Sequence, residues 1–208
     1  MSIRIKICGV TRFEDAAAAV DAGADMIGLN CWPRSPRYIP IERGVQIARA
    51  FRYGIDVVAV FVNPTVDEVL STLDRLGTST VQLHGVETAD FVRSLGDVPV
   101  IKAFSIGERA DIERLAGFPA ATYLLDARDV DLPGGTGRTL DWTLAREAAQ
   151  YGRILLAGGL TPDNVAEAVR TAQPWGVDSA SGTEESPGIK DRRKIEMFVK
   201  NARAAAGK

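Results

Sequence analysis

The chain has 208 residues, of which 46% are apolar and 25% are charged, and its formal net charge is -2. This composition is that of an ordinary globular protein and excludes the disordered, fibrous and disulfide-stapled classes. A nearly neutral charge gives no general electrostatic footprint for nucleic acid, so a phosphate-bearing ligand would need a local site.

The ends and cysteines of the chain predict its cellular setting. The first residues are charged and lack the apolar segment of a signal peptide, and no stretch is long and uncharged enough for a membrane helix. The only two cysteines, Cys8 and Cys31, argue for a reducing compartment. We therefore expect a cytoplasmic protein with neither a membrane nor a nucleic-acid partner.

The first apolar run, over 3–8, alternates isoleucines with other side chains and has the period of a strand. Gly9 breaks the run, and Thr11 with Glu14 has the spacing of a capping box at a helix start. Cys8 is thereby predicted at the carboxyl end of a strand before a helix N-terminus, whose partial positive charge favours a thiolate. A small buried hydrophobe is the commoner interpretation of an isolated cysteine.

The same unit, a short apolar run, a breaker and an amphipathic stretch, recurs along the chain. Strands are predicted over 3–8, 26–30, 57–62, 80–84, 98–104, 121–126, 153–157 and 175–179. Helices are predicted over 12–23, 41–53, 65–76, 87–96, 108–116, 140–150, 162–172 and 191–205. Eight such units predict an α/β fold, a single (β/α)8 TIM barrel domain over 1–208. An open doubly wound sheet is the rival, but no G-x-G-x-x-G follows the first strand.

In a (β/α)8 barrel, function lies at the carboxyl ends of the strands. Polar residues are predicted there on strands one, four, six and eight: Cys8, His84, Asp126 and Asp178. Alternation puts Lys6 on the face of Cys8 and Gln82 on that of His84. Because buried polar groups are costly unless they are paired, this end of the barrel is predicted to be a wet pocket.

The loops after strands seven and eight favour a phosphate site. Gly158 and Gly159 allow backbone N–H groups to approach an anion, while Ala180 and Ser181 can add amides and a hydroxyl. The alternative is a tight turn followed by helix-capping serines. Matching positions in the last two units favour phosphate.

Asp126 ends an otherwise apolar strand. A carboxyl there is either a helix cap or a catalytic acid whose pKa its apolar walls raise. The Gly-rich segment 127–138 that follows is interpreted as a loop over the site, not a nucleotide-binding loop, because the Walker spacing is absent.

Two further side chains are candidates for substrate binding. Arg37 follows a loop stiffened by Pro33 and Pro36, and its planar fork suits a carboxylate, although a solvated surface arginine is the alternative. His84 is the only histidine. With no Cys or acidic cluster at ligand spacing, we expect no metal site, and without a G-x-S-x-G turn a Ser-His-Asp triad is disfavoured.

Short motifs along nearly the whole chain resemble, in order, the phosphoribosylanthranilate isomerase family. They are the segments 6–9, 35–38, 60–63, 81–85, 125–127, 134–137 with 141–142, 158–162, and 177–178 with 181–182 and 187–188. Two positions depart from the family's pattern: Cys31 stands where an aromatic residue is more usual, and Ala180 lacks a hydroxyl. Neither change touches Cys8 or Asp126.

The resemblance implies a (β/α)8 barrel and an Amadori rearrangement of N-(5-phosphoribosyl)anthranilate in tryptophan biosynthesis, without metal or organic cofactor. Asp126 matches the family's general acid and Cys8 its general base, so both pKa values are expected to move toward neutrality. Arg37 would hold the anthranilate carboxylate, and Asp178 would face the sugar hydroxyls. His84 would line the substrate pocket, the loops after strands seven and eight would hold the phosphate, and the protein would be a monomer or homodimer.

Two other classes stay open: another phosphosugar-binding TIM-barrel enzyme, such as a ribulose-phosphate epimerase or an indole-glycerol-phosphate synthase, or a non-catalytic phosphosugar-binding protein. A single histidine disfavours a metal-dependent epimerase, and the synthase is disfavoured because Lys102 lies too far inside its run and no glutamate is well placed. The presence of Cys8 and Asp126 disfavours the non-catalytic protein. One further hypothesis is that Cys8 and Cys31, which lie at the ends of neighbouring predicted strands, form a disulfide on oxidation. The alternative is two reduced thiols that face different ways.

Overall fold

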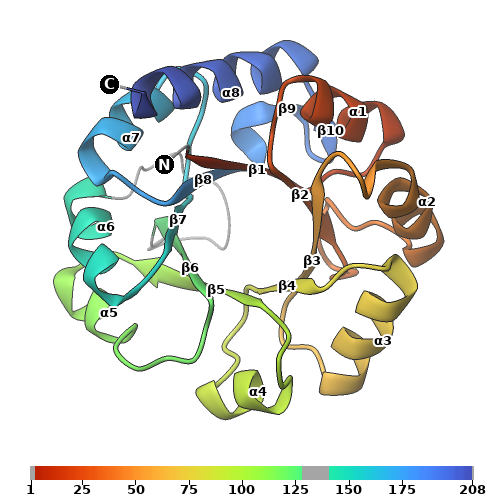
Figure 1. The fold of residues 1–208 in the computed structure, drawn as a ribbon, viewed down its shortest axis with the longest axis horizontal. Helices are drawn as coiled ribbons and strands as arrows, with labels where there is room; N and C mark the ends of the chain where they lie inside the picture. The colour runs from red at the N-terminus through yellow and green to blue at the C-terminus, as the bar shows by residue number, and fades with distance from the viewer. Residues whose placement is uncertain (1–2, 128–140, 208) are drawn as a thin grey trace.

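The computed structural model describes residues 3–127 and 141–207, and of Ala127 only the backbone. Eight parallel strands pair in sequence order and close into a barrel, since β8 pairs with β1. Figure 1 shows these strands as a ring with the helices outside it. The strands are β1 (Arg4–Cys8), β2 (Met26–Asn30), β3 (Asp56–Phe61), β4 (Thr80–Leu83), β5 (Val100–Ile106), β6 (Thr122–Ala127), β7 (Ile154–Leu156) and β8 (Gly176–Ser179).

In the described residues, eight α-helices cover the ring of strands. They are α1 (Phe13–Asp21), α2 (Ile41–Phe51), α3 (Val66–Leu76), α4 (Ala89–Ser94), α5 (Arg109–Glu113), α6 (Trp142–Ala148), α7 (Val165–Ala172) and α8 (Arg192–Ala206). The predicted (β/α)8 barrel is confirmed, and the open doubly wound alternative is wrong. The predicted loop over 127–138 lies outside the described residues, apart from the backbone of residue 127.

The barrel wall separates two apolar clusters, as expected when alternate side chains of each strand face in and out. The larger cluster lies between strands and helices and includes Ile5, Ile7 and Phe104. The smaller fills the barrel interior: Met26, Val58, Ile101, Ala103, Leu124, Leu155 and Ala157. The inward positions of β1 break this apolar pattern, because they carry Lys6 and Cys8.

A short antiparallel hairpin between β8 and α8 was not predicted. It consists of β9 (Glu184–Ser186) and β10 (Ile189–Lys190), and follows the 3-10 turn η2 (Ser181–Thr183). Figure 1 shows it beside α1, and Asp15 of α1 accepts a 3.2 Å hydrogen bond from the Lys190 amide. Three- and two-residue strands are too short for the period-2 pattern by which strands are recognised.

The predicted capping box at Thr11 and Glu14 is wrong. Helix α1 begins at Phe13 with Arg12 as its N-cap residue, and the Thr11 hydroxyl donates to Gly188 O instead. The same signature forms a true capping box at α3, where Thr65 and Glu68 cap each other. Cys8 therefore lies five residues before α1, beyond the first turn in which a helix dipole acts.

No helix in the described part of the chain is long and apolar enough to cross a membrane.

Candidate active site

Cys8 lies at the carboxyl end of β1 with its thiol directed into the barrel. It pairs in register with Gly28 of β2, and 8% of the residue is exposed. A Cβ atom on Gly28 would lie 2.7 Å from Cys8 Sγ and 3.1 Å from Lys6 Nζ. The missing side chain of Gly28 is therefore what gives the thiol and the ammonium room beside each other.

Beneath Cys8, Lys6 forms a buried ion pair with Asp178. Lys6 Nζ lies 2.9 Å from Asp178 Oδ1, and the two residues face each other in register across β1 and β8. The Lys6 side chain has no exposed surface and that of Asp178 has 8%. Asp178, predicted to face the sugar hydroxyls, thus accepts a hydrogen bond from Lys6 with its Oδ1 atom, and Lys6 leaves its Oδ2 atom unused.

The electrostatic setting of Cys8 differs from the expectation of a lowered pKa. Burial raises the pKa of the Cys8 thiol above its ordinary value, while the positive charge of Lys6 works against this and Asp178 adds to it. The helix-dipole argument fails because α1 begins too late. In the described structure the thiol form of Cys8 is therefore favoured, and the nearby lysines oppose that preference.

Arg37, the predicted carboxylate ligand, is held by a residue that sequence reasoning missed. Its Nε and Nη2 atoms donate to the two carboxylate oxygens of Glu184 at 2.8 and 2.7 Å. Glu184 lies on β9 and its side chain is 4% exposed. Such a bidentate pair fixes the plane of the guanidinium, and it leaves Nη1 of Arg37 unused by Glu184.

Lys190 of β10 is the second buried lysine at this end of the barrel. Its side chain has no exposed surface, and its Nζ lies 3.2 Å from Glu184 Oε1. The same ammonium donates to Ala180 O at 2.8 Å. Burial lowers the pKa of Lys190, whereas the charge of Glu184 raises it, and the net shift is downward. Lys190 thereby joins the Arg37–Glu184 pair to the loop after β8.

The loops after β7 and β8 are packed against each other. Gly158 and Gly159 both have left-handed φ values, +80° and +67°, and the Cα of Gly182 lies so close to Leu160 O that a Cβ there would clash. Among described residues, no partner accepts a hydrogen bond from the amides of four loop residues: Gly158, Gly159, Ala180 and Ser181. Unpaired amides on a tightly turned backbone suit an anion.

Asp126 is the penultimate residue of β6, on the far side of the mouth, and is half-buried. Its Oδ2 lies 3.6 Å from His84 Nε2, and 36% and 39% of the two side chains are exposed. The Gln82 side-chain amide contacts His84 Nδ1 at 3.1 Å. Ser105 of β5, not predicted as a site residue, is in register with Asp126. The structure thus places the predicted acid and His84 together, across the barrel from Cys8.

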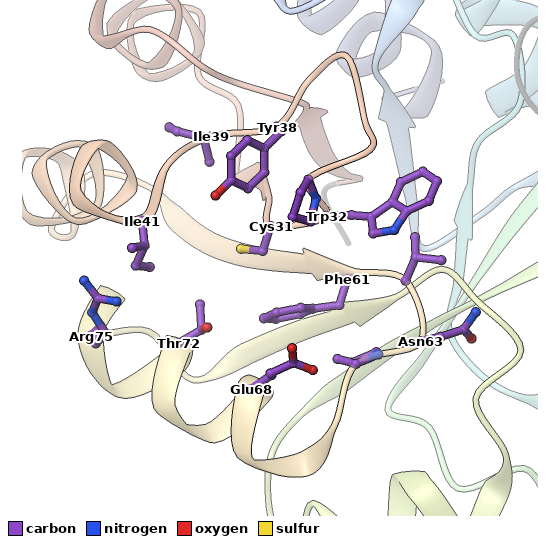
Figure 2. Close-up of a pocket in the computed structure, with 13 residues that line it drawn as sticks. Cys31, Trp32, Tyr38, Ile39, Ile41, Phe61, Asn63, Glu68, Thr72 and Arg75 are labelled. Atoms are coloured by element: carbon purple, nitrogen blue, oxygen red, sulfur yellow. The ribbon is translucent and has the colours of Figure 1, made fainter.

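Cys31 faces away from Cys8, toward a cavity outside the barrel. Its thiol contacts Leu29 O at 3.6 Å, and burial raises the pKa of Cys31 to about 11. This cavity of about 280 Å³ is lined by the segment between β2 and α2, the end of β3 and helix α3. Figure 2 shows the Cys31 sulfur directed into it, near Phe61 and Tyr38. Both cysteines are free. This geometry favours the alternative of two reduced thiols that face different ways.

A closed parallel barrel with a thiol and a carboxyl at the carboxyl ends of its strands has the architecture of the (β/α)8-barrel enzymes. The family model described as N-(5'phosphoribosyl)anthranilate (PRA) isomerase matches residues 5–201. The chain is 44% identical over 200 residues to the N-(5'-phosphoribosyl)anthranilate isomerase of Geotalea uraniireducens, covering 96% of this chain and 98% of that one. The chain therefore belongs to the phosphoribosylanthranilate isomerase family.

Solved structures agree with this assignment. The crystal structure of phosphoribosyl anthranilate isomerase from Thermotoga maritima has a TM-score of 0.91 and 37% identity, covering 97% of this chain and 99% of that one. A phosphoribosyl anthranilate isomerase in complex with reduced 1-(o-carboxyphenylamino)-1-deoxyribulose 5-phosphate has a TM-score of 0.88 and 35% identity, with the same coverage. The Thermotoga enzyme is described as dimeric.

Proposed function

We infer that the chain is a phosphoribosylanthranilate isomerase of tryptophan biosynthesis. It converts N-(5-phosphoribosyl)anthranilate into 1-(2-carboxyphenylamino)-1-deoxyribulose 5-phosphate. The observation that carries this function is family membership along nearly the full chain. The other phosphosugar-binding classes considered from sequence gain no support from these relatives.

The reaction we propose is an internal redox step that needs one acid and one base. Asp126 donates a proton to the furanose ring oxygen, the C1–O bond breaks, and a protonated Schiff base forms at C1. Cys8 then removes the proton from C2, and the electron pair of that C–H bond moves to give an enolamine. Tautomerisation, with a proton returned to C1, gives the ketone, so C1 is reduced while C2 is oxidised.

The remaining predicted residues divide the substrate between two ends of the mouth. Arg37 binds the anthranilate carboxylate through the Nη1 side that Glu184 leaves free. The loop amides around Gly159 and Ser181 bind the phosphate. Asp178 offers its second oxygen to a sugar hydroxyl, and His84 lines the pocket beside Asp126.

We further propose that residues 1–208 form one domain that acts in the cytoplasm as a monomer or homodimer. The unbroken barrel supports the single domain, since α8 packs against both α7 and α1. The proposed chemistry uses no metal and no organic cofactor, because both proton transfers run through side chains of the chain itself.

A fluorescence assay of substrate consumption tests the function and the two roles together. We expect Cys8→Ala and Asp126→Ala each to lose at least about a hundredfold in kcat/KM, the low end of general acid–base contributions. Cys31→Ala is the matched control, because this thiol faces the outer cavity, and it should retain most activity. Near-full activity in either of the first two variants would remove that residue from its role, and an inactive parent protein would overturn the function.

A further inference from the structure

Lys6 is out of place among the side chains inside the barrel. Inward positions of β2, β3 and β7 carry the apolar residues Met26, Val58 and Leu155, whereas Lys6 is a charged residue with no exposed surface. Burying an ammonium costs several kcal/mol unless it is paired, and even a paired one is often no more stable than an apolar replacement. Fold stability alone therefore gives a weak reason for a lysine here.

The position of Lys6 suggests a different reason. Its Nζ donates to Asp178 Oδ1 at 2.9 Å, which occupies one of its three N–H bonds. Both Lys6 Nζ and Cys8 Sγ border the vacant Cβ position of Gly28, at 3.1 and 2.7 Å. An N–H of the ammonium is therefore available to the sulfur, and no side chain of Gly28 stands between the two.

We propose that Lys6 is a positioning residue that stabilises Cys8 as a thiolate, with Asp178 holding the Lys6 ammonium in place. This inference rests on the proposed function, because it concerns the base of that reaction. A cysteine that removes the C2 proton has to be a thiolate at the start of the step. Lys6 supplies the charge that the missing helix dipole does not.

Lys6 is not itself the base. Burial works to lower the pKa of Lys6, but the charges of Asp178 and Cys8 outweigh it, and the net shift is upward. The ammonium therefore stays protonated through the pH range in which the enzyme would act, and has no lone pair with which to accept the C2 proton.

Other charged groups also face Cys8, and they set the background. Lys190 of β10 and Arg37 of the β2–α2 loop add positive charge, and Asp178 of β8 adds negative charge. Glu184 of β9 pairs with both Arg37 and Lys190. Three cations and two carboxylates leave one unbalanced positive charge, so an anionic sulfur is favoured over what burial alone would give.

The test is a direct titration of the Cys8 thiolate by its ultraviolet absorbance, in a Cys31→Ser background so that Cys8 is the only thiol. We expect Lys6→Met to raise the apparent pKa of Cys8 by at least about one unit, a tenfold loss of thiolate at a given lower pH. Lys6→Arg keeps the charge and should restore most of the thiolate. The acid limb of the kcat/KM profile should move in parallel with each titration.

Asp178→Asn is a second variant, for which we expect a change in the Cys8 pKa opposite to that of Lys6→Met. It also tests the proposal if Lys6→Met does not fold. It keeps an oxygen for Lys6 but removes a negative charge near the sulfur, so the pKa of Cys8 should fall. An unchanged Cys8 titration in folded Lys6→Met, or an unchanged or raised pKa in Asp178→Asn, would overturn the proposal. Because the titration needs no substrate, a parent protein without isomerase activity would refute the function and leave this result readable.

Discussion

Cys8 and Asp126, on opposite sides of the barrel mouth, have charged neighbours that differ in burial. On the side of β1, β8 and the β9–β10 hairpin, the side chains of Lys6, Lys190 and Glu184 are at most 4% exposed, and each has an ionic partner. On the side of β4 and β6, Asp126 and His84 are more than one-third exposed and lie 3.6 Å apart. The proposed base, Cys8, thus lies among buried charges that are held in place, whereas the proposed acid, Asp126, lies where solvent can reach it.

Among the variants that test this contrast, the largest effect is expected on the stability of the fold, at Glu184. Burial tends to raise the pKa of Glu184, but the hydrogen bond from Arg37 and the charge of Lys190 bring it below its ordinary value. A lowered carboxyl pKa stabilises the fold at pH above the unfolded-state value, and this stabilisation is lost as pH falls through the folded-state value. Glu184→Gln should therefore cost about 3 kcal/mol in the free energy of unfolding at neutral pH, and less in acid.

Urea unfolding at a series of pH values measures this difference. The exposed neighbour Glu185 provides the matched control, and Glu185→Gln should change stability little at any pH. A loss in Glu184→Gln that is the same at every pH would show that packing, not charge, is what Glu184 contributes on the buried side.

A smaller effect is expected on the open side. His84 and Asp126 form a partly exposed pair, and pairs that solvent reaches are worth at most about 1 kcal/mol. His84→Ala should therefore lower kcat/KM by no more than about fivefold. Val86→Ala, at an exposed residue two positions along, is the control. A hundredfold loss in His84→Ala would mean that the open side is as strictly arranged as the buried one.

The smallest effect is expected at Cys31, which lies outside the buried group of charges around Cys8. Because Cys31 faces the cavity outside the barrel that the β2–α2 segment, β3 and α3 enclose, its thiol should take no part in protecting or inactivating Cys8. We expect the parent protein and Cys31→Ser to lose isomerase activity at the same rate under a mild oxidant. Slower loss in Cys31→Ser would revive the hypothesis of a Cys8–Cys31 bridge.

The barrel and the strand-end residues could be predicted because both follow from local patterns. Eight apolar runs alternating with amphipathic stretches leave few folds, and a barrel brings the carboxyl ends of all its strands to one mouth. Cys8, Asp126 and Asp178 were therefore placed at one end from sequence alone, and the structure puts them there. Whether they act as proposed stays a prediction.

The charged pairs could not be predicted, because Lys6–Asp178 and Arg37–Glu184 join residues far apart in the chain and Glu184–Lys190 lies in a hairpin that has no sequence pattern. Lys6 was placed inside the barrel by alternation, but its partner Asp178 becomes a neighbour only when β8 closes on β1. Glu184 and Lys190 lie in strands of three and two residues that have no readable period. The one usable signal was the Pro187–Gly188 turn between them. The wrong capping box has the same cause: a local pattern predicted a bond from Thr11 to its own helix, but in the fold Thr11 donates to Gly188, far away in the sequence.

The β9–β10 hairpin connects the proposed carboxylate site to the proposed phosphate site, and so sets the length of ligand that can reach both. One end of it grips Arg37 through Glu184, and the other supports Ala180 through Lys190. Both proposed sites are therefore held by the same short hairpin, and this hairpin restricts the distance between them. A ligand that carries only the phosphate or only the aryl carboxylate would occupy one of these two sites. The distance between the sites therefore selects for a ligand that carries both groups.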